Sequence, residues 1–115
     1  MKLMITSQGE SLESLPNPRF GRSPAFIKYD LSDMSWKAFR NDAVSQSGGA
    51  GVAASQFMIN HDISAVISGA FGPNAMRVLS AAGIKMFRFD QTLRTIQEVI
   101  DAYINKALSE VTEEE

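Results

Sequence analysis

The chain of 115 residues contains no cysteine and a single histidine. Without cysteine it forms no disulfide, no thiolate-ligated zinc or iron–sulfur site, and no cysteine nucleophile. One histidine also excludes a histidine-rich metal site. The sequence therefore carries no conventional set of metal ligands.

Long apolar runs and a strong charge of either sign are lacking too. The formal net charge is -2, and 44% of the residues are hydrophobic, which is ordinary for a globular domain and favours no nucleic-acid partner. The apolar runs are too short for a signal peptide or a membrane span. We expect one cytoplasmic domain over residues 1–108, with no membrane contact, and a solvated acidic tail over residues 109–115.

Hydrophobic patterning predicts three strands and then alternating helices and strands. The strands are expected over residues 2–6, 25–31 and 35–41, and later over residues 63–68 and 84–89. Helices are expected from the glycine-rich segment 47–51 to about Asn60, and from Pro73 to Gly83. We place the N-cap of a final helix at Thr92, with a core stripe of Leu93, Ile96, Ile100, Ile104 and Ala107.

This pattern predicts an α/β domain with a mixed five-stranded sheet and the element order β-β-β-α-β-α-β-α. Ribonuclease-H-like three-layer domains share that order. Right-handed crossovers make the strands that begin near Lys2, Ile63 and Ile84 parallel. The loops that follow them would therefore emerge at one edge of the sheet, where open α/β sheets bind ligands.

Two glycine-rich turns lead into helices at that edge. Free N–H groups and the helix dipole at such starts favour an anion. The alternative is that these glycines only allow close packing of a helix entry, because neither segment has the spacing of a P-loop or a dinucleotide fingerprint. The candidate binding residues in these turns are Gly48, Gly49, Gly51, Gly69, Gly72 and Asn74.

The segment PNPRFGRSP, residues 16–24, holds three of the four prolines and two arginines. Guanidinium groups present planar donors to carboxylate or phosphate oxygens, so Arg19 and Arg22 are candidates for closing over an anion. The prolines would reduce the entropy lost in ordering the loop. The alternative is a surface loop with ordinary solvated arginines.

Catalytic constellations are missing from the predicted crevice. No acid ends the first or fourth predicted strand and Asp90 stands alone, so two-metal phosphoryl transfer is not expected. His61 is placed in a turn at the opposite edge, which excludes a Ser-His-Asp hydrolase. We expect a protein that is not an enzyme.

An ordered set of segments from Lys2 to about Leu108 resembles the dinitrogenase iron–molybdenum cofactor biosynthesis family, whose accessory domains include NifX and the C-terminal part of NifB. The matching segments are KLMIT, FGRSPAF, GGAG, DISAVISGAFGPNAM and AGI. The resemblance implies a small stand-alone member with a ribonuclease-H-like fold. It also implies a role in binding or carrying the iron–molybdenum cofactor or an iron–sulfur precursor.

The resemblance directs attention to Arg19, Phe20, Gly21 and Arg22 together with the Gly48–Gly51 loop. Family members often carry histidine directly before the Phe-Gly pair, where this chain has Arg19. Binding of an anionic iron–sulfur or iron–molybdenum-type cluster would then be non-covalent and electrostatic, with a metal ligand supplied by a protein partner. The alternative function is a regulatory or interaction domain that binds a phosphorylated or carboxylate metabolite, or a protein, at the same edge.

Overall fold

The computed structural model describes residues 1–42 and 48–112. Ser47, which we included in the first helix entry, and residues 113–115 of the predicted tail lie outside the described residues. The elements follow the order β1 (Lys2–Ser7), β2 (Ala25–Asp30), β3 (Trp36–Arg40), α1 (Ala50–Asn60), β4 (Ala65–Ser68), α2 (Pro73–Ala81), β5 (Lys85–Arg88), α3 (Ile96–Ile104) and β6 (Ser109–Val111).

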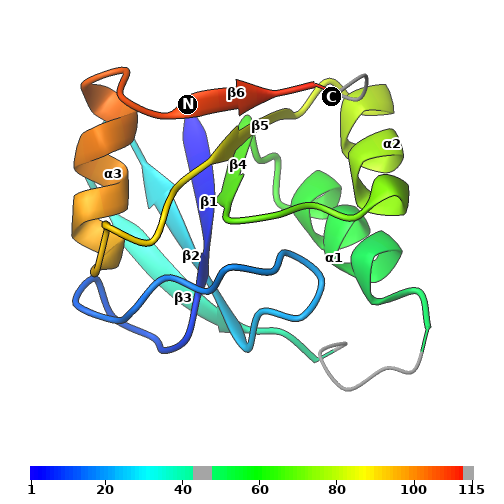
Figure 1. Ribbon diagram of the computed structural model, residues 1–115, viewed down its shortest axis with the longest axis horizontal. Helices are drawn as coiled ribbons and strands as arrows, with labels where there is room; N and C mark the ends of the chain where they lie inside the picture. The colour runs from blue at the N-terminus through cyan, green and yellow to red at the C-terminus, as the bar shows by residue number, and fades with distance from the viewer. Residues whose placement is uncertain (43–47, 113–115) are drawn as a thin grey trace.

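The six strands form one mixed sheet in the order β3-β2-β1-β4-β5-β6. β1, β2 and β3 form an antiparallel meander, and β1, β4 and β5 are mutually parallel, both as predicted. Helices α1 and α2 lie on one side of the sheet and α3 lies on the other (Figure 1). The loops after β1, β3, β4 and β5 consequently emerge at the same edge.

Two apolar clusters hold the three layers together. On the α1 and α2 side, Met4 and Val66 from the sheet pack with Met58 and Leu79 from the helices. The cluster on the α3 side contains the alternate sheet residues, such as Ile5 and Ile67, with the helix residues Ile96, Val99 and Ile100. Residues 3–7 of β1 are all buried because helices cover both faces of this central strand.

The expected five-stranded sheet is wrong, because β6 adds a sixth strand. It pairs antiparallel with β5, placing Val111 opposite Met86. Val111 is buried in the cluster beneath α1 and α2. A single apolar residue among polar and acidic neighbours has no strand period, so the sequence predicts a tail over residues 109–111. The likeness to ribonuclease-H-like domains, expected from the element order and the family resemblance, stays a prediction.

The final helix begins later and ends earlier than predicted. Its N-cap is Thr95, whose side chain accepts a hydrogen bond from the Glu98 backbone while the Glu98 carboxylate accepts from the Thr95 N–H, a capping box. Thr92 instead donates to Asp90 in a preceding turn. The predicted core stripe fails at its end, because Ile104 is 53% exposed and Ala107 lies beyond the helix.

Within residues 1–42 and 48–112, every helix is too short or too polar to cross a membrane.

Candidate functional site

A cleft of about 410 Å³ lies at the sheet edge where the loops after β1 and β4 meet the start of α1. It brings together eight of the ten predicted site residues: Arg19, Phe20, Gly21, Arg22, Gly49, Gly51, Gly72 and Asn74. Gly48 is exposed and Gly69 lies beneath the loop, so neither lines the cleft. The lining also includes Val52, Ala70 and Phe71, which sequence analysis did not single out as site residues.

The loop of residues 16–24, called the arginine loop from here on, packs against the loop after β4. Arg19 and Ala70 form an isolated parallel bridge, and the Phe20 N–H donates to the Ala70 carbonyl at 3.1 Å. Gly69 permits this approach, since a Cβ there would lie 2.7 Å from the Pro18 carbonyl oxygen. The glycine predicted to approach a ligand therefore admits the protein's own loop.

Asn17 holds the loop from below, and sequence analysis missed it. Its side-chain amide donates to the Arg19 carbonyl at 2.9 Å and its side-chain oxygen accepts from Gln8 at 2.7 Å. The Asn17 carbonyl accepts from the buried Thr6 hydroxyl at 2.6 Å. An asparagine between two prolines was the available signal, because asparagine side chains commonly bond the nearby backbone.

The second half of the loop is fixed to β3 and α1. Asn41 donates from its side chain to the Ser23 carbonyl at 2.9 Å, and its backbone N–H donates to the Pro24 carbonyl at 2.9 Å. A Cβ on Gly21 would lie 3.0 Å from the Gly51 nitrogen, so the loop passes directly against the first turn of α1. Arg19 and Arg22 thus extend from a loop fixed at both ends.

Two helix starts face this cleft. Gly49 caps α1 in the left-handed conformation, with a φ of 74°, and Gly72 caps α2 with Pro73 as the first helical residue. Neither cap supplies a side-chain hydrogen bond, and neither first turn contains an acidic residue. The first N–H groups of a helix have no partner within the helix, so those of Gly51, Val52 and Ala75 can donate to an anion.

Phe20 and Phe71 form the apolar part of the cleft. Their ring centroids are 5.4 Å apart, and Phe20 is only 1% exposed. The Phe20 ring also lies in the core with Phe26, at a centroid distance of 6.3 Å. Phe20 therefore contributes mainly to packing, and the predicted binding role rests on its neighbours.

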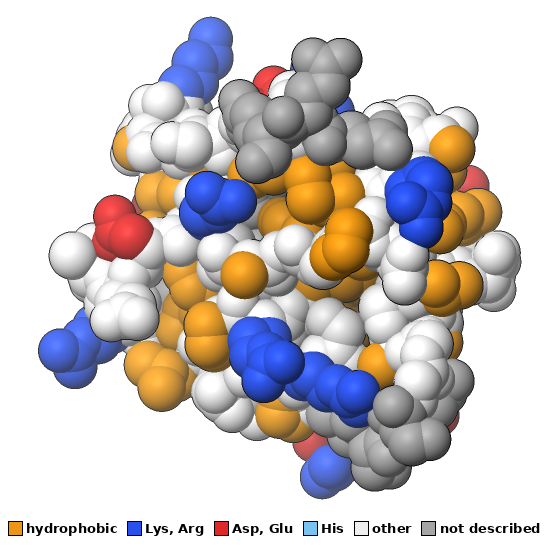
Figure 2. Space-filling view, turned by 45° about the vertical axis from the view of Figure 1, so that its right-hand side comes forward, with side chains coloured by type: hydrophobic (Ala, Val, Ile, Leu, Met, Phe, Trp, Pro, Cys, Tyr) orange, Lys and Arg blue, Asp and Glu red, His pale blue; other side chains and the backbone are white. Residues whose placement is uncertain are grey.

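The cleft is positively charged. Arg19 is exposed and Arg22 half-buried, and no acidic side chain occurs among the described residues that line it. In the view of Figure 2, Lys and Arg side chains are spread over the face, with two adjacent in its lower middle, and acidic side chains lie mostly near the outline. The helix N-termini and the arginines would therefore both stabilise a bound anion.

The donor set suits an anion and offers no metal ligand. Backbone N–H groups, guanidinium groups and the Asn74 amide can donate hydrogen bonds to sulfide or carboxylate acceptors. His61 follows α1 at the opposite edge, as predicted, and it lies beside Lys28 and Lys37. Across the described part of the chain, no group of three His, Cys, Asp or Glu residues could hold a metal ion.

Comparisons with known proteins agree with this architecture. The apo form of the orange protein from Desulfovibrio gigas is 28% identical, with a TM-score of 0.90 over 96% of this chain and 92% of that one. The NMR structure of a NifB-like protein from Thermotoga, assigned to the DUF35 family, is 32% identical. Its TM-score is 0.85, over 96% of this chain and 93% of the other.

No curated protein sequence matches the chain. The sequence profile of the dinitrogenase iron–molybdenum cofactor family matches residues 1–106, which is nearly the whole chain. The chain therefore belongs to the dinitrogenase iron–molybdenum cofactor family.

Proposed function

We propose that the protein is a non-catalytic carrier that holds an anionic metal–sulfur cluster in the cleft between the arginine loop and the two helix starts. The observation that carries this proposal is the convergence of the α1 and α2 N-termini with Arg19 and Arg22 on one cleft. The family is named for the iron–molybdenum cofactor. That name agrees with a cluster as cargo.

The residues that line the cleft are suited to binding an anion and not to catalysing a reaction of it. Among the described residues of the cleft there is no His, Lys, Cys, Asp or Glu, the side chains that most often transfer protons or attack a substrate. Its hydrogen-bond donors are backbone N–H groups of the helix starts and guanidinium groups, which donate hydrogen bonds and accept none. Such a cleft binds an anion without changing it.

The same donor set makes binding reversible. With no thiolate or imidazole in the cleft, cargo is held by hydrogen bonds and charge, and a protein with cysteine or histidine ligands can withdraw it. We therefore infer a delivery role, in which a protein partner supplies the metal ligands. Val52 is 43% exposed at the cleft rim and offers an apolar contact for that partner.

Anaerobic titration with a synthetic iron–sulfur cluster capped by carboxylate-bearing thiolates tests the proposal. Absorbance and paramagnetic resonance of the protein fraction after gel filtration measure retained cluster. The double variant Arg19→Ala, Arg22→Ala should bind the cluster at least about tenfold more weakly, because each substitution removes charge-assisted hydrogen bonds from the guanidinium group to the cluster. The matched control Arg88→Ala, Arg94→Ala removes two exposed arginines outside the cleft and should change affinity less than about twofold.

Two results would count against a cluster carrier. One is the absence of retained cluster in the wild-type protein, and the other is equal retention by the two double variants. Inorganic phosphate and a dicarboxylate, titrated with unfolding temperature as the readout, separate the carrier from a sensor of small anions. A ligand that binds only the native state raises that temperature with its concentration.

A further inference from the structure

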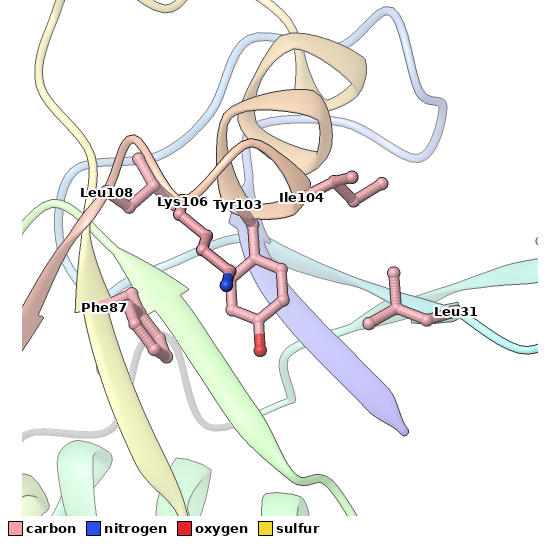
Figure 3. A pocket seen from close by; sticks show the side chains of 6 residues that line it. All are labelled: Leu31, Phe87, Tyr103, Ile104, Lys106 and Leu108. Carbon is pink, nitrogen blue, oxygen red and sulfur yellow. The ribbon is translucent and has the colours of Figure 1, made fainter.

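A second concave site lies on the α3 side of the sheet, on the opposite side from α1 and α2. This groove has a volume of about 560 Å³ and shares no lining residue with the cleft. Its volume lies within the roughly 300–1,000 Å³ range of small-molecule sites. The side chains around it are Leu31, Phe87, Tyr103, Ile104, Lys106 and Leu108 (Figure 3).

The groove exists because the sheet is covered unequally. Two helices cover one face, whereas α3 alone covers the other (Figure 1) and packs against β1, β2 and β4. The first two turns of α3 bury Ile96, Val99 and Ile100, but Ile104 in its last turn is 53% exposed. Phe87 on β5 packs edge-on against Tyr103, with ring centroids 5.1 Å apart, and forms the apolar floor.

Lys106 occupies a backbone conformation that normally selects glycine. Its φ is 59°, and it follows α3 in a motif where the Ala107 N–H donates to the Ala102 carbonyl at 2.9 Å. Helix α2 ends in the same motif, with Gly83 at a φ of 76° and the Ile84 N–H bonded to the Leu79 carbonyl. Lysine in the glycine position costs conformational free energy, as it does for Met34 and Asp62, the other described non-glycine residues with a positive φ.

The polar groups of the groove are donors above an apolar floor. Lys106 is exposed and, among the described residues, forms no salt bridge. The Tyr103 hydroxyl donates to the Met1 sulfur at 3.4 Å, a weak acceptor that a carboxylate would readily replace. Burial, and next the nearby carboxylate of Glu110, raise the pKa of Tyr103, so this hydroxyl keeps its proton.

We propose that the groove binds a small amphipathic monocarboxylate. Its apolar chain or ring packs against Phe87 and Ile104, and its carboxylate pairs with the Lys106 ammonium and accepts from the Tyr103 hydroxyl. A second copy of the chain fits less well, because a twofold contact centred on the groove would bring two Lys106 ammonium groups together. The ligand is small and singly charged, and its site is independent of the cleft.

Titration of the full chain with octanoate and with 1-octanol tests this proposal, followed by NMR of the Leu31, Ile104 and Leu108 methyl groups. Octanoate should give saturable shifts and bind about fivefold or more tightly than 1-octanol, since only octanoate pairs with Lys106. Lys106→Gln should reduce that preference to what the Tyr103 hydroxyl alone supplies, and Lys106→Arg should keep it. Glu110→Gln should strengthen octanoate binding by removing a like charge.

Lys106→Gly separates a ligand role from a structural one. It should raise the unfolding temperature, because glycine suits the left-handed conformation, while it weakens octanoate as Lys106→Gln does. Ile104→Ala should weaken both probes, whereas the matched control Leu15→Ala, at a side chain 51% exposed outside the groove, should change neither. The double variant of Arg19 and Arg22 should bind octanoate like the wild type.

Three results would overturn the proposal. They are equal affinity for octanoate and 1-octanol, unchanged octanoate affinity in Lys106→Gln, and methyl shifts that depend on protein concentration without any probe. The last would show that a second copy covers the groove. A negative result would not bear on the proposed carrier function, because no residue of the cleft lines the groove.

Discussion

Gly21 and Gly51 lie backbone against backbone, so that a Cβ added to Gly21 would lie 3.0 Å from the Gly51 nitrogen and 3.1 Å from its Cα. One glycine belongs to the arginine loop and the other to the first turn of α1. This contact sets how closely the two arginines approach a helix start. The geometry of the cleft therefore depends on two positions that contribute no side chain.

Gly21→Ala should lower the free energy of unfolding by about 1–2 kcal/mol, because the added methyl group must push the loop away from backbone atoms that cannot rotate aside. It should also weaken cluster binding. Gly48→Ala is the matched control, since nothing lies within 4 Å of an added Cβ there. Chemical denaturation measures both variants, and equal stability of the two would show that the contact is not constraining.

Asn17→Ala should destabilise the protein by about 1–3 kcal/mol, since it leaves the Arg19 carbonyl and the Gln8 amide without their partner. Cluster affinity should fall as well, because the loop loses its attachment on the side of β1. Gln8→Ala removes only the exposed partner and should cost less. If Asn17→Ala loses stability but binds cluster normally, Asn17 supports the fold and does not position Arg19.

Thr95→Ala should cost about 1 kcal/mol of stability, because it removes the side-chain half of the capping box on α3. Thr92→Ala should cost less than half as much, since Thr92 bonds only an exposed Asp90 in the described turn. Thermal unfolding of the two variants compares them directly. A larger loss in Thr92→Ala would contradict the assignment of the N-cap.

His61 should make stability depend on pH between about 7 and 5. Burial, and then the positive charges of Lys28 and Lys37, lower the pKa of His61 in the folded chain. The unfolded chain then binds the proton more readily, so this contribution is complete above the unfolded pKa and is lost as pH falls through the folded pKa.

His61→Phe is the variant that tests this pH dependence, because it keeps a ring against Phe39 and Phe57. The pH dependence of the free energy of unfolding in this window should then disappear. Hydrogen bonds, chiefly from Ser32, Ser35 and Thr92, lower the pKa of Asp30, Asp33 and Asp90, respectively. Those carboxylates affect stability below about pH 5, outside this window, and do not obscure the result.

Most of the fold followed from periodicity, since β1, β2 and β4 are strongly apolar and Gly83 ends α2 as predicted. The errors came where tertiary contacts decide the structure. β6 has one buried residue, Val111, and is recognisable only from its pairing with β5. Thr92 and Thr95 both suit an N-cap, and the Glu98 reciprocal bond selects Thr95.

The site was predictable to the level of its loops. The sheet topology correctly predicted that the arginine loop lies beside both glycine-rich turns, because the parallel strands end at one edge of the sheet. Sequence could not show that Gly69 accommodates Pro18 or that Asn17 supports Arg19, since both depend on how a loop without periodicity folds back. The sequence also could not show that Lys106 adopts a positive φ, because this conformation depends on where α3 ends.

The most direct test of the carrier account is to titrate nitrogen-15-labelled protein with tetrathiomolybdate, a diamagnetic metal–sulfur dianion, and follow the backbone amides. The account predicts saturable shifts with one dissociation constant for Gly51, Val52 and Ala75 at the two helix starts, and none for Phe87 or Lys106 in the groove. Absence of saturable shifts, or shifts centred away from these amides, would contradict the claim that the helix starts and arginines form one anion site.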